Sequence, residues 1–81
     1  MALQRPKQPM PEDVSRRLSK LGLMVAYEER PPYQRNDYLA WIDRAKQEAT
    51  RERRIAQMLD ELAAGDVYMK MRWSPAKRRT R

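Results

Sequence analysis

The sequence has neither cysteine nor histidine, and only two of its 81 residues are glycine. A chain without cysteine forms no disulfide, and a chain without either residue lacks the usual ligands of a structural zinc site. Histidine and cysteine are also the commonest general base and the most reactive nucleophile. We therefore expect a protein that is not an enzyme and that folds without a metal, a cofactor or a covalent cross-link.

The other residues that could support catalysis do not form a recognisable motif. No sequence signature surrounds the serines, and there is no glycine-rich loop that could hold phosphates. Neighbouring acids such as Asp60 and Glu61 lie on segments predicted to be helical, so the two side chains should splay outward rather than converge. This pattern supports the prediction of a non-enzymatic protein.

Long apolar runs are also missing. None approaches the roughly 20 residues that a transmembrane helix needs, and the first residues, "MALQRPKQPMP", lack the apolar core of a secretory signal. We expect a cytoplasmic protein. A chain of this length buries only about 60% of its unfolded surface, so we expect a protein partner or a second copy of the chain to complete its core.

The net charge of +7 is concentrated at the two ends of the chain. Residues 1–10 contain two basic residues and residues 67–81 contain six, and neither segment contains an acid. Residues 11–66 hold 10 basic and 11 acidic side chains. The ends would therefore attract nucleic acid or any other polyanion, whatever the segment between them does.

Proline, glycine and the spacing of apolar residues predict the helices. The first should begin near Pro11 and stop before Gly22, and the segment "LMVAYEER" could add two turns before Pro31 and Pro32 end it. The third should begin at Asn36, a good N-cap, and the last should run from Glu48 or Thr50 to Ala64. The expected buried faces consist of Val14, Leu18 and Leu21 in the first helix, Tyr38, Trp41, Ile42 and Ala45 in the third, and Ile55, Met58, Leu59, Leu62 and Ala63 in the last.

These segments predict an all-α fold, a compact bundle of three to four short helices with an extended C-terminal segment. The expected organisation is a disordered leader at residues 1–10, a helical domain at 11–66, an extended docking or pairing segment at 67–74 and a basic disordered tail at 75–81.

The segment "VYMKMRW" changes the period from helical to alternating. Val67, Met69, Met71 and Trp73 occupy every second position, as in an extended segment with one buried face. Because the chain has no other strand candidate, we do not expect a sheet within one molecule. Two alternatives remain: the segment lies across its own helices, or it pairs with the same segment of a second copy.

A family resemblance rests on the segment from Tyr33 to Gly65, which resembles the C-terminal helical motif of the YdeI/OmpD-associated family, commonly labelled bacteriocin-protection proteins. The residues that carry it are Tyr38, Trp41, Ile42, Ala45, Lys46, Thr50, Arg51, Arg54, Ile55 and Gly65. "PPYQRNDYLAWI" and "YMKMRW" look typical of a short-chain branch. The resemblance implies a small helical accessory module, and the label suggests a role at the bacterial cell envelope.

Two departures limit what the resemblance carries over. Members often have Pro and Glu where this chain has Glu48 and Ala49, so we expect a softer break between the last two helices. Larger relatives also carry an additional N-terminal domain that this sequence does not show. Any activity of that domain is not carried over.

A candidate anion- or partner-binding cluster consists of Trp41, Arg44, Lys46, Arg51 and Arg54. At a spacing of three residues, the Arg44 guanidinium could lie against the Trp41 indole. A tight turn between the two helices could bring the other basic groups onto one phosphate or carboxylate. The alternative is structural: a core tryptophan surrounded by cations that cap helices and pair locally.

Two hypotheses for the function follow. The first is a small helical interaction module that binds a protein partner or itself, with Val67, Met69, Met71 and Trp73 as the docking or dimer segment. The second is a nucleic-acid or anion-binding protein that uses the basic cluster between Arg44 and Arg54 together with the basic ends.

Overall fold

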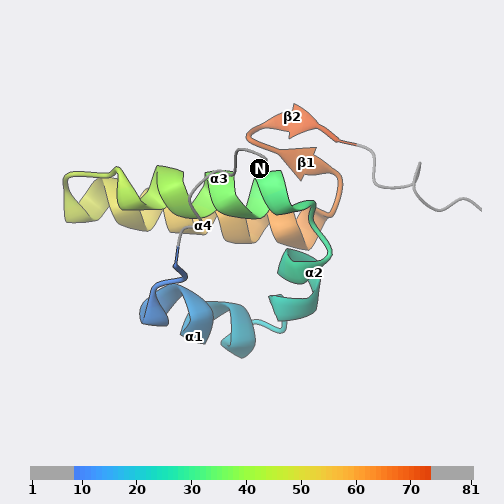
Figure 1. The fold of residues 1–81 in the computed structure, drawn as a ribbon, viewed down its shortest axis with the longest axis horizontal. Coiled ribbons are helices and arrows are strands. Elements are labelled where there is room, and N and C mark those ends of the chain that lie inside the picture. The colour runs from blue at the N-terminus through green and yellow to red at the C-terminus, as the bar shows by residue number, and fades with distance from the viewer. Residues whose placement is uncertain (1–8, 74–81) are drawn as a thin grey trace, which may run out of the picture.

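Four α-helices and a small β-hairpin make up the computed structural model, which describes residues 9–73 (Figure 1). The elements in order are α1 (Glu12–Lys20), α2 (Met24–Glu28), α3 (Pro32–Asp43), α4 (Glu48–Ala64), β1 (Val67–Tyr68) and β2 (Met71–Arg72). The predicted all-α bundle of three to four short helices is confirmed.

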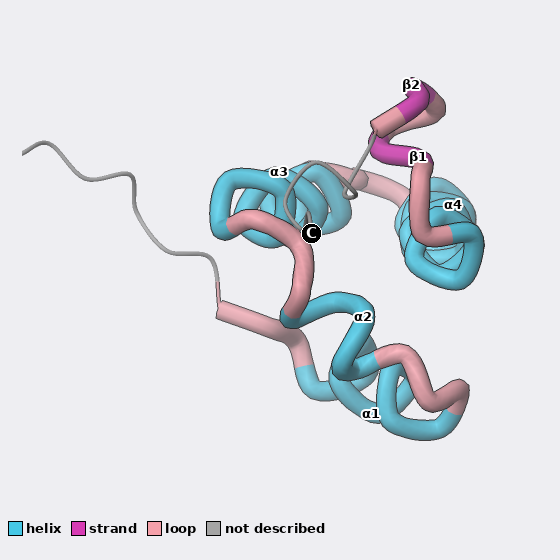
Figure 2. The backbone as a smooth tube through the Cα atoms, turned by 90° about the vertical axis from the view of Figure 1, so that its right-hand side faces the viewer, coloured by secondary structure: helices cyan, strands magenta, loops and turns pink. Residues whose placement is uncertain are grey.

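The helices form two layers. α3 and α4 lie side by side and antiparallel, joined by residues 44–47, and the shorter α1 and α2 cross one face of this pair (Figures 1 and 2). The hairpin follows α4 and therefore lies at the end of the bundle where α3 begins. This arrangement brings the C-terminal strands beside residues that are more than thirty positions earlier in the sequence.

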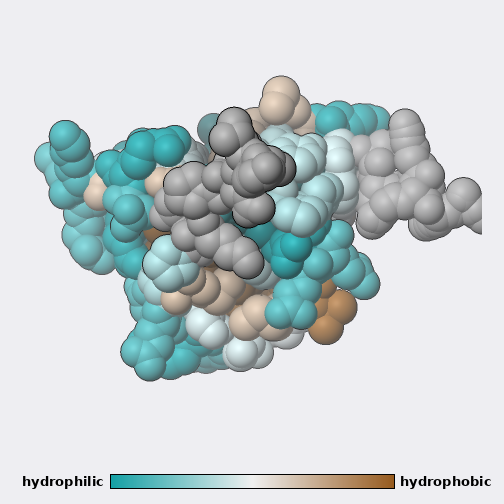
Figure 3. Space-filling view, in the orientation of Figure 1, coloured by the Kyte–Doolittle hydropathy of each residue, from teal (hydrophilic) through white to brown (hydrophobic). Residues whose placement is uncertain are grey.

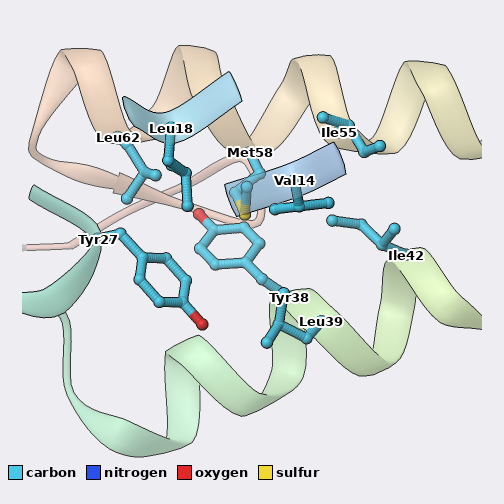
Figure 4. Packing of buried hydrophobic residues seen from close by; sticks show 9 residues of the cluster. All are labelled: Val14, Leu18, Tyr27, Tyr38, Leu39, Ile42, Ile55, Met58 and Leu62. Carbon is cyan, nitrogen blue, oxygen red and sulfur yellow. The ribbon is translucent and has the colours of Figure 1, made fainter. Parts of the chain in front are cut away.

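All four helices contribute to the core. Its buried hydrophobic residues are Val14, Leu18, Tyr27, Tyr38, Leu39, Ile42, Ile55, Met58 and Leu62. Figure 4 shows these side chains converging between the two layers. The predicted faces of α1, α3 and α4 supply seven of the nine. Tyr27 and Leu39 complete the set because they face the partner layer from α2 and α3.

Both glycines stop a helix as predicted. Gly22 follows α1 with φ +70°, and Gly65 caps α4 with φ +88°. No atom lies within 4 Å of the position that a Cβ would take at either residue. The left-handed backbone conformation, rather than a lack of space, therefore accounts for glycine at both positions.

Three predictions about the helices are wrong. α3 begins at Pro32 rather than Asn36, because proline is well suited to the first helical position while Pro31 remains extended before it. Leu21, which caps α1 and is 57% exposed, and Ala63, which is exposed on α4, are not buried as predicted. The break between the last two helices is not soft, since α3 ends at Asp43 and α4 begins at Glu48.

The prediction of an extended segment without an intramolecular sheet is also wrong. β1 and β2 pair antiparallel with each other, Val67 opposite Arg72 and Tyr68 opposite Met71. The connection is a two-residue turn at Met69 and Lys70. A single alternating run thus folds back on itself, which the sequence did not indicate because the turn lacks the usual Asn-Gly or Asp-Gly.

The predicted leader and tail fall almost entirely outside the described residues. Of residues 1–10, the structure describes only Pro9 and Met10, and Met10 packs against the core. Ser74 and the predicted tail at residues 75–81 lie beyond the described part.

Candidate functional site

The carboxylate of Glu61 is buried at the junction of α3, α4 and the hairpin. Glu61 is only 5% exposed although it is charged. Four groups donate hydrogen bonds to it: the Tyr38 hydroxyl, the Gln57 side-chain amide at 3.0 Å, and the backbone N–H groups of Met69 and Lys70, each at 2.8 Å. A buried carboxylate is stabilised only by such complete hydrogen bonding.

Our prediction that Asp60 and Glu61 both splay outward is wrong for Glu61. Met58, Glu61 and Leu62 have the i, i+3, i+4 spacing of one helix face, and Met58 and Leu62 are buried. This spacing is the sequence feature that could have indicated that Glu61 is buried. A glutamate within an apolar stripe must find hydrogen-bond donors in the interior.

Glu61 stabilises an unusual turn. Met69 and Lys70 have positive φ angles of 50° and 66°, the pattern of a type I′ hairpin turn. For residues other than glycine, this conformation costs roughly 1–2 kcal/mol each. Both backbone N–H groups donate to Glu61, and these charge-assisted bonds offset that cost. The turn therefore depends on a side chain eight residues earlier.

Arg30 joins three elements at the same junction. Its side chain is buried and donates to the Gln34 side-chain oxygen and to the Glu61 backbone carbonyl, both at 3.0 Å. Its guanidinium carbon also lies 4.7 Å from the ring centre of Trp73. Arg30 thus connects the start of α3, the last turn of α4 and the end of the hairpin.

Three tyrosines fix the orientation of the hairpin. The Tyr68 ring packs edge-on against Tyr33 and Tyr38, with ring centres 5.9 and 5.5 Å apart. The Tyr68 hydroxyl donates to Asp37 at 2.7 Å. Burial, followed by the bond to a carboxylate, raises the pKa of both Tyr38 and Tyr68 well above the ordinary value. Both phenols therefore remain protonated donors at neutral pH.

The outer strand of the hairpin faces away from the bundle. Met71 is 59% exposed and pairs with Tyr68 across the hairpin, and Tyr33, whose ring packs against that of Tyr68, is 48% exposed. Lys70 and Arg72 on either side of Met71 are exposed as well. We call this set of Tyr33, Lys70, Met71 and Arg72 the hairpin surface.

The structure separates the residues of the predicted docking segment. Met69 packs against the core, Met71 points outward, and Val67 and Trp73 are half-buried. The expectation of one continuous buried face along Val67, Met69, Met71 and Trp73 is therefore wrong, because the turn reverses the chain between Met69 and Met71.

The predicted basic cluster does not converge on one point. Arg54 donates to the Trp41 carbonyl at 2.7 Å and its guanidinium lies 5.2 Å from the Trp41 ring centre, so it takes the place expected for Arg44. Trp41 is half-buried against the core. Arg44 and Lys46 are exposed in the connection between α3 and α4. Arg51 points to α1.

Two ion pairs join α1 to α4. Arg51 binds Asp13 through two contacts, at 2.7 and 3.1 Å, and Arg17 binds Glu52 through two contacts, at 2.8 and 3.0 Å. The hydrogen bond from Arg51 lowers the pKa of Asp13 from its ordinary value of 3.8 to about 2. The Arg51 guanidinium thus serves to position α1.

This shift predicts the behaviour of Asp13→Asn in acid. Because folding lowers the pKa, the ion pair stabilises the fold fully above the ordinary value of 3.8 and loses this effect as the pH falls through about 2. Urea unfolding should show the variant less stable by about 1 kcal/mol or less at neutral pH. The difference should shrink as the pH falls from 3.8 and disappear below about pH 2. Glu12→Gln, which changes an exposed acid of the same turn, is the control, and a difference between wild type and Asp13→Asn that is independent of pH would contradict the assignment.

Two kinds of site are absent from the described part of the chain. Residues 9–73 contain no group of three or more acidic side chains arranged to hold a metal ion. Within the same residues, no helix has both the length and the apolar character to cross a membrane.

Comparison with known proteins places the fold in a family. The family model described as bacteriocin-protection, YdeI or OmpD-associated matches residues 8–65, which is more than half of the chain. No curated protein and no solved structure matches. The match includes all four helices and Glu61 and ends before the hairpin. The chain therefore belongs to the bacteriocin-protection, YdeI or OmpD-associated family.

Proposed function

We propose that this chain is a non-enzymatic protein-binding module, and that its hairpin surface binds an acidic protein partner with an apolar pocket. The observation that carries the proposal is Met71, a large apolar side chain that is 59% exposed on the outer strand of a firmly anchored hairpin. If the hairpin only covered the core, its outer strand would need no apolar residue.

The anchoring favours binding with little loss of conformational entropy. Glu61, Arg30 and the tyrosine cluster hold the hairpin from three sides, so a partner would meet a surface that is already ordered. β2 pairs with β1 as one of two strands in the described sheet and lies on its outer side in Figures 1 and 2. Its outer edge could accept a strand from the partner.

Charge suggests the chemistry of the partner. Lys70 and Arg72 flank Met71, and both are exposed. Acidic residues around an apolar pocket would complement this arrangement and would speed association.

The state of Glu61 supports a role without catalysis. Two donors already bond to each of its carboxylate oxygens. Because donors of the protein itself occupy both oxygens, neither is free to contact a substrate as a general base must.

The nucleic-acid hypothesis gains no comparable support. Arg51 is paired with Asp13, and Arg54 is bonded to the Trp41 carbonyl. These two bonds reduce the number of donors that the cluster can offer to a phosphate. The expected cytoplasmic location and the cell-envelope role suggested by the family label remain predictions.

A site-directed photo-crosslinker tests the proposal. A benzophenone amino acid placed at Met71 in cells of the source organism should give a discrete adduct with another protein. The same group at Arg53, an exposed position on α4, should not. Lys70→Glu with Arg72→Glu should reduce the yield of the adduct about tenfold, because two favourable contacts become repulsive. The same adducts at both positions, adducts only with a second copy of the chain, or a yield unchanged by charge reversal would overturn the proposal.

A further inference from the structure

A second exposed apolar surface lies at the corner between α1 and α2. Leu21, which ends α1, is 57% exposed, and Val25, in the first turn of α2, is 68% exposed. Among residues 9–73, they are the two exposed large hydrophobic residues that lie away from the hairpin surface. Figure 3 shows exposed apolar surface over α2. An apolar surface of this kind in a small domain often marks an interface.

Charges of opposite sign lie on the two sides of this corner. Arg16 and Lys20 are exposed on α1 and are four residues apart, so they share one face of the helix. Glu28 and Glu29 are exposed at the end of α2, three and four residues after Val25, and so share its face. The order of these exposed residues along α1, the corner and α2 is therefore basic, apolar, acidic. We call these six residues, Arg16, Lys20, Leu21, Val25, Glu28 and Glu29, the corner surface.

We infer that a second copy of this chain binds the corner surface around a two-fold axis. In a two-fold dimer the same patch serves on both subunits, so residue i of one meets residue j of the other and the reverse. With the axis at Leu21 and Val25, the apolar side chains of the two copies pack together. Lys20 of each copy then faces Glu28 and Glu29 of the other.

The arrangement of charges on the corner surface favours a second copy of the chain over an acidic protein, a basic protein or an anionic membrane. An acidic protein would be attracted by Arg16 and Lys20 and repelled by Glu28 and Glu29, and an anionic membrane surface would meet the same conflict. A basic partner would meet the opposite conflict. Rotation of the patch onto itself pairs every charge with its opposite, which makes the corner surface self-complementary.

This inference goes beyond the proposed function and does not depend on it. The corner surface shares no residue with the hairpin surface. Failure to find a protein adduct at Met71 would leave the dimer intact, and a monomeric chain would leave the proposed partner at the hairpin intact.

Charge reversal provides a direct test with the full chain. Sedimentation velocity over a range of concentrations should show a reversible doubling of mass. Lys20→Glu alone and Glu29→Lys alone should each weaken the dimer by about tenfold or more in Kd, because two-fold symmetry creates two repulsive contacts. An equimolar mixture of the two variants should restore association, since each charge again meets its opposite. Arg53→Glu, a reversal on exposed α4, should have no effect.

The outcomes distinguish the inference from its alternatives. Val25→Lys should abolish the dimer while the thermal unfolding of the monomer remains close to that of wild type, since the side chain is mostly exposed. A chain that stays monomeric at all concentrations would overturn the inference. A dimer that tolerates Val25→Lys, or single variants whose mixture does not associate, would overturn it as well.

Discussion

Glu61→Gln is expected to destabilise the domain by about 3 kcal/mol, a large fraction of the total stability of a chain this small. The glutamine side chain has the same shape but replaces one acceptor oxygen with a donor. The single remaining oxygen can accept from only two of the four donors that bond to the carboxylate in the wild type. At least one buried donor is left without a partner, and the turn loses the interaction that offsets its strain.

Equilibrium unfolding in urea measures this effect. The neighbouring Asp60→Asn is the matched control, because it makes the same chemical change at an exposed position of the same helix. It should shift the free energy of unfolding by less than about 0.5 kcal/mol. If Glu61→Gln were as mild as this control, the carboxylate would not be the group that holds the hairpin.

Arg30→Met is expected to cost about 2–4 kcal/mol of stability. Methionine has a similar length and keeps the apolar contacts, but it offers no donor to the Gln34 side-chain oxygen or the Glu61 carbonyl. The buried Gln34 oxygen is then left without a donor, and the Glu61 carbonyl keeps only the bond from the Gly65 N–H. Arg30→Lys should recover less than half of the loss, because one ammonium lacks the planar fork that reaches both acceptors and stacks on Trp73.

Urea unfolding combined with tryptophan emission tests this prediction. The sequence has two tryptophans, so the measurement is made in a Trp41→Phe background that leaves Trp73 as the reporter. Arg30→Met should shift the Trp73 emission to longer wavelength as the ring loses the guanidinium that covers it. Arg53→Met, at an exposed position on α4, is the control. An emission spectrum and a stability equal to those of wild type would show that Arg30 only fills space.

The sequence predicted the helices well where the determinants are local. Gly22 and Gly65 mark helix ends through their backbone preference, and Val14 and Leu18 or Ile55 and Met58 mark buried faces through their spacing. The start of α3 was missed because a Pro-Pro pair both ends one helix and permits the next at its second residue.

The junction at Glu61 could be predicted only in part. The position of Glu61 within the apolar stripe of α4 was readable, but its partners come from α3 and from the turn after α4. Arg30 bonds to a carbonyl 31 residues away, and no pattern around Arg30 indicates that. The hairpin was missed for the same reason: Met69 and Lys70 are poor turn residues locally, and a distant carboxylate makes their conformation acceptable.

The bonds between Glu61 and the hairpin turn also bear on how this segment could diverge among relatives. The carboxylate contacts backbone N–H groups, which every residue except proline possesses. The exposed side chain of Lys70 is therefore free to vary, with asparagine and glycine favoured by the backbone angles, whereas Met69 also packs against the core. The length of the segment is not free, since one inserted or deleted residue would move both N–H groups out of reach. Relatives could therefore keep the bonds between the glutamate and the turn while the exposed residues of the turn change which partner is bound.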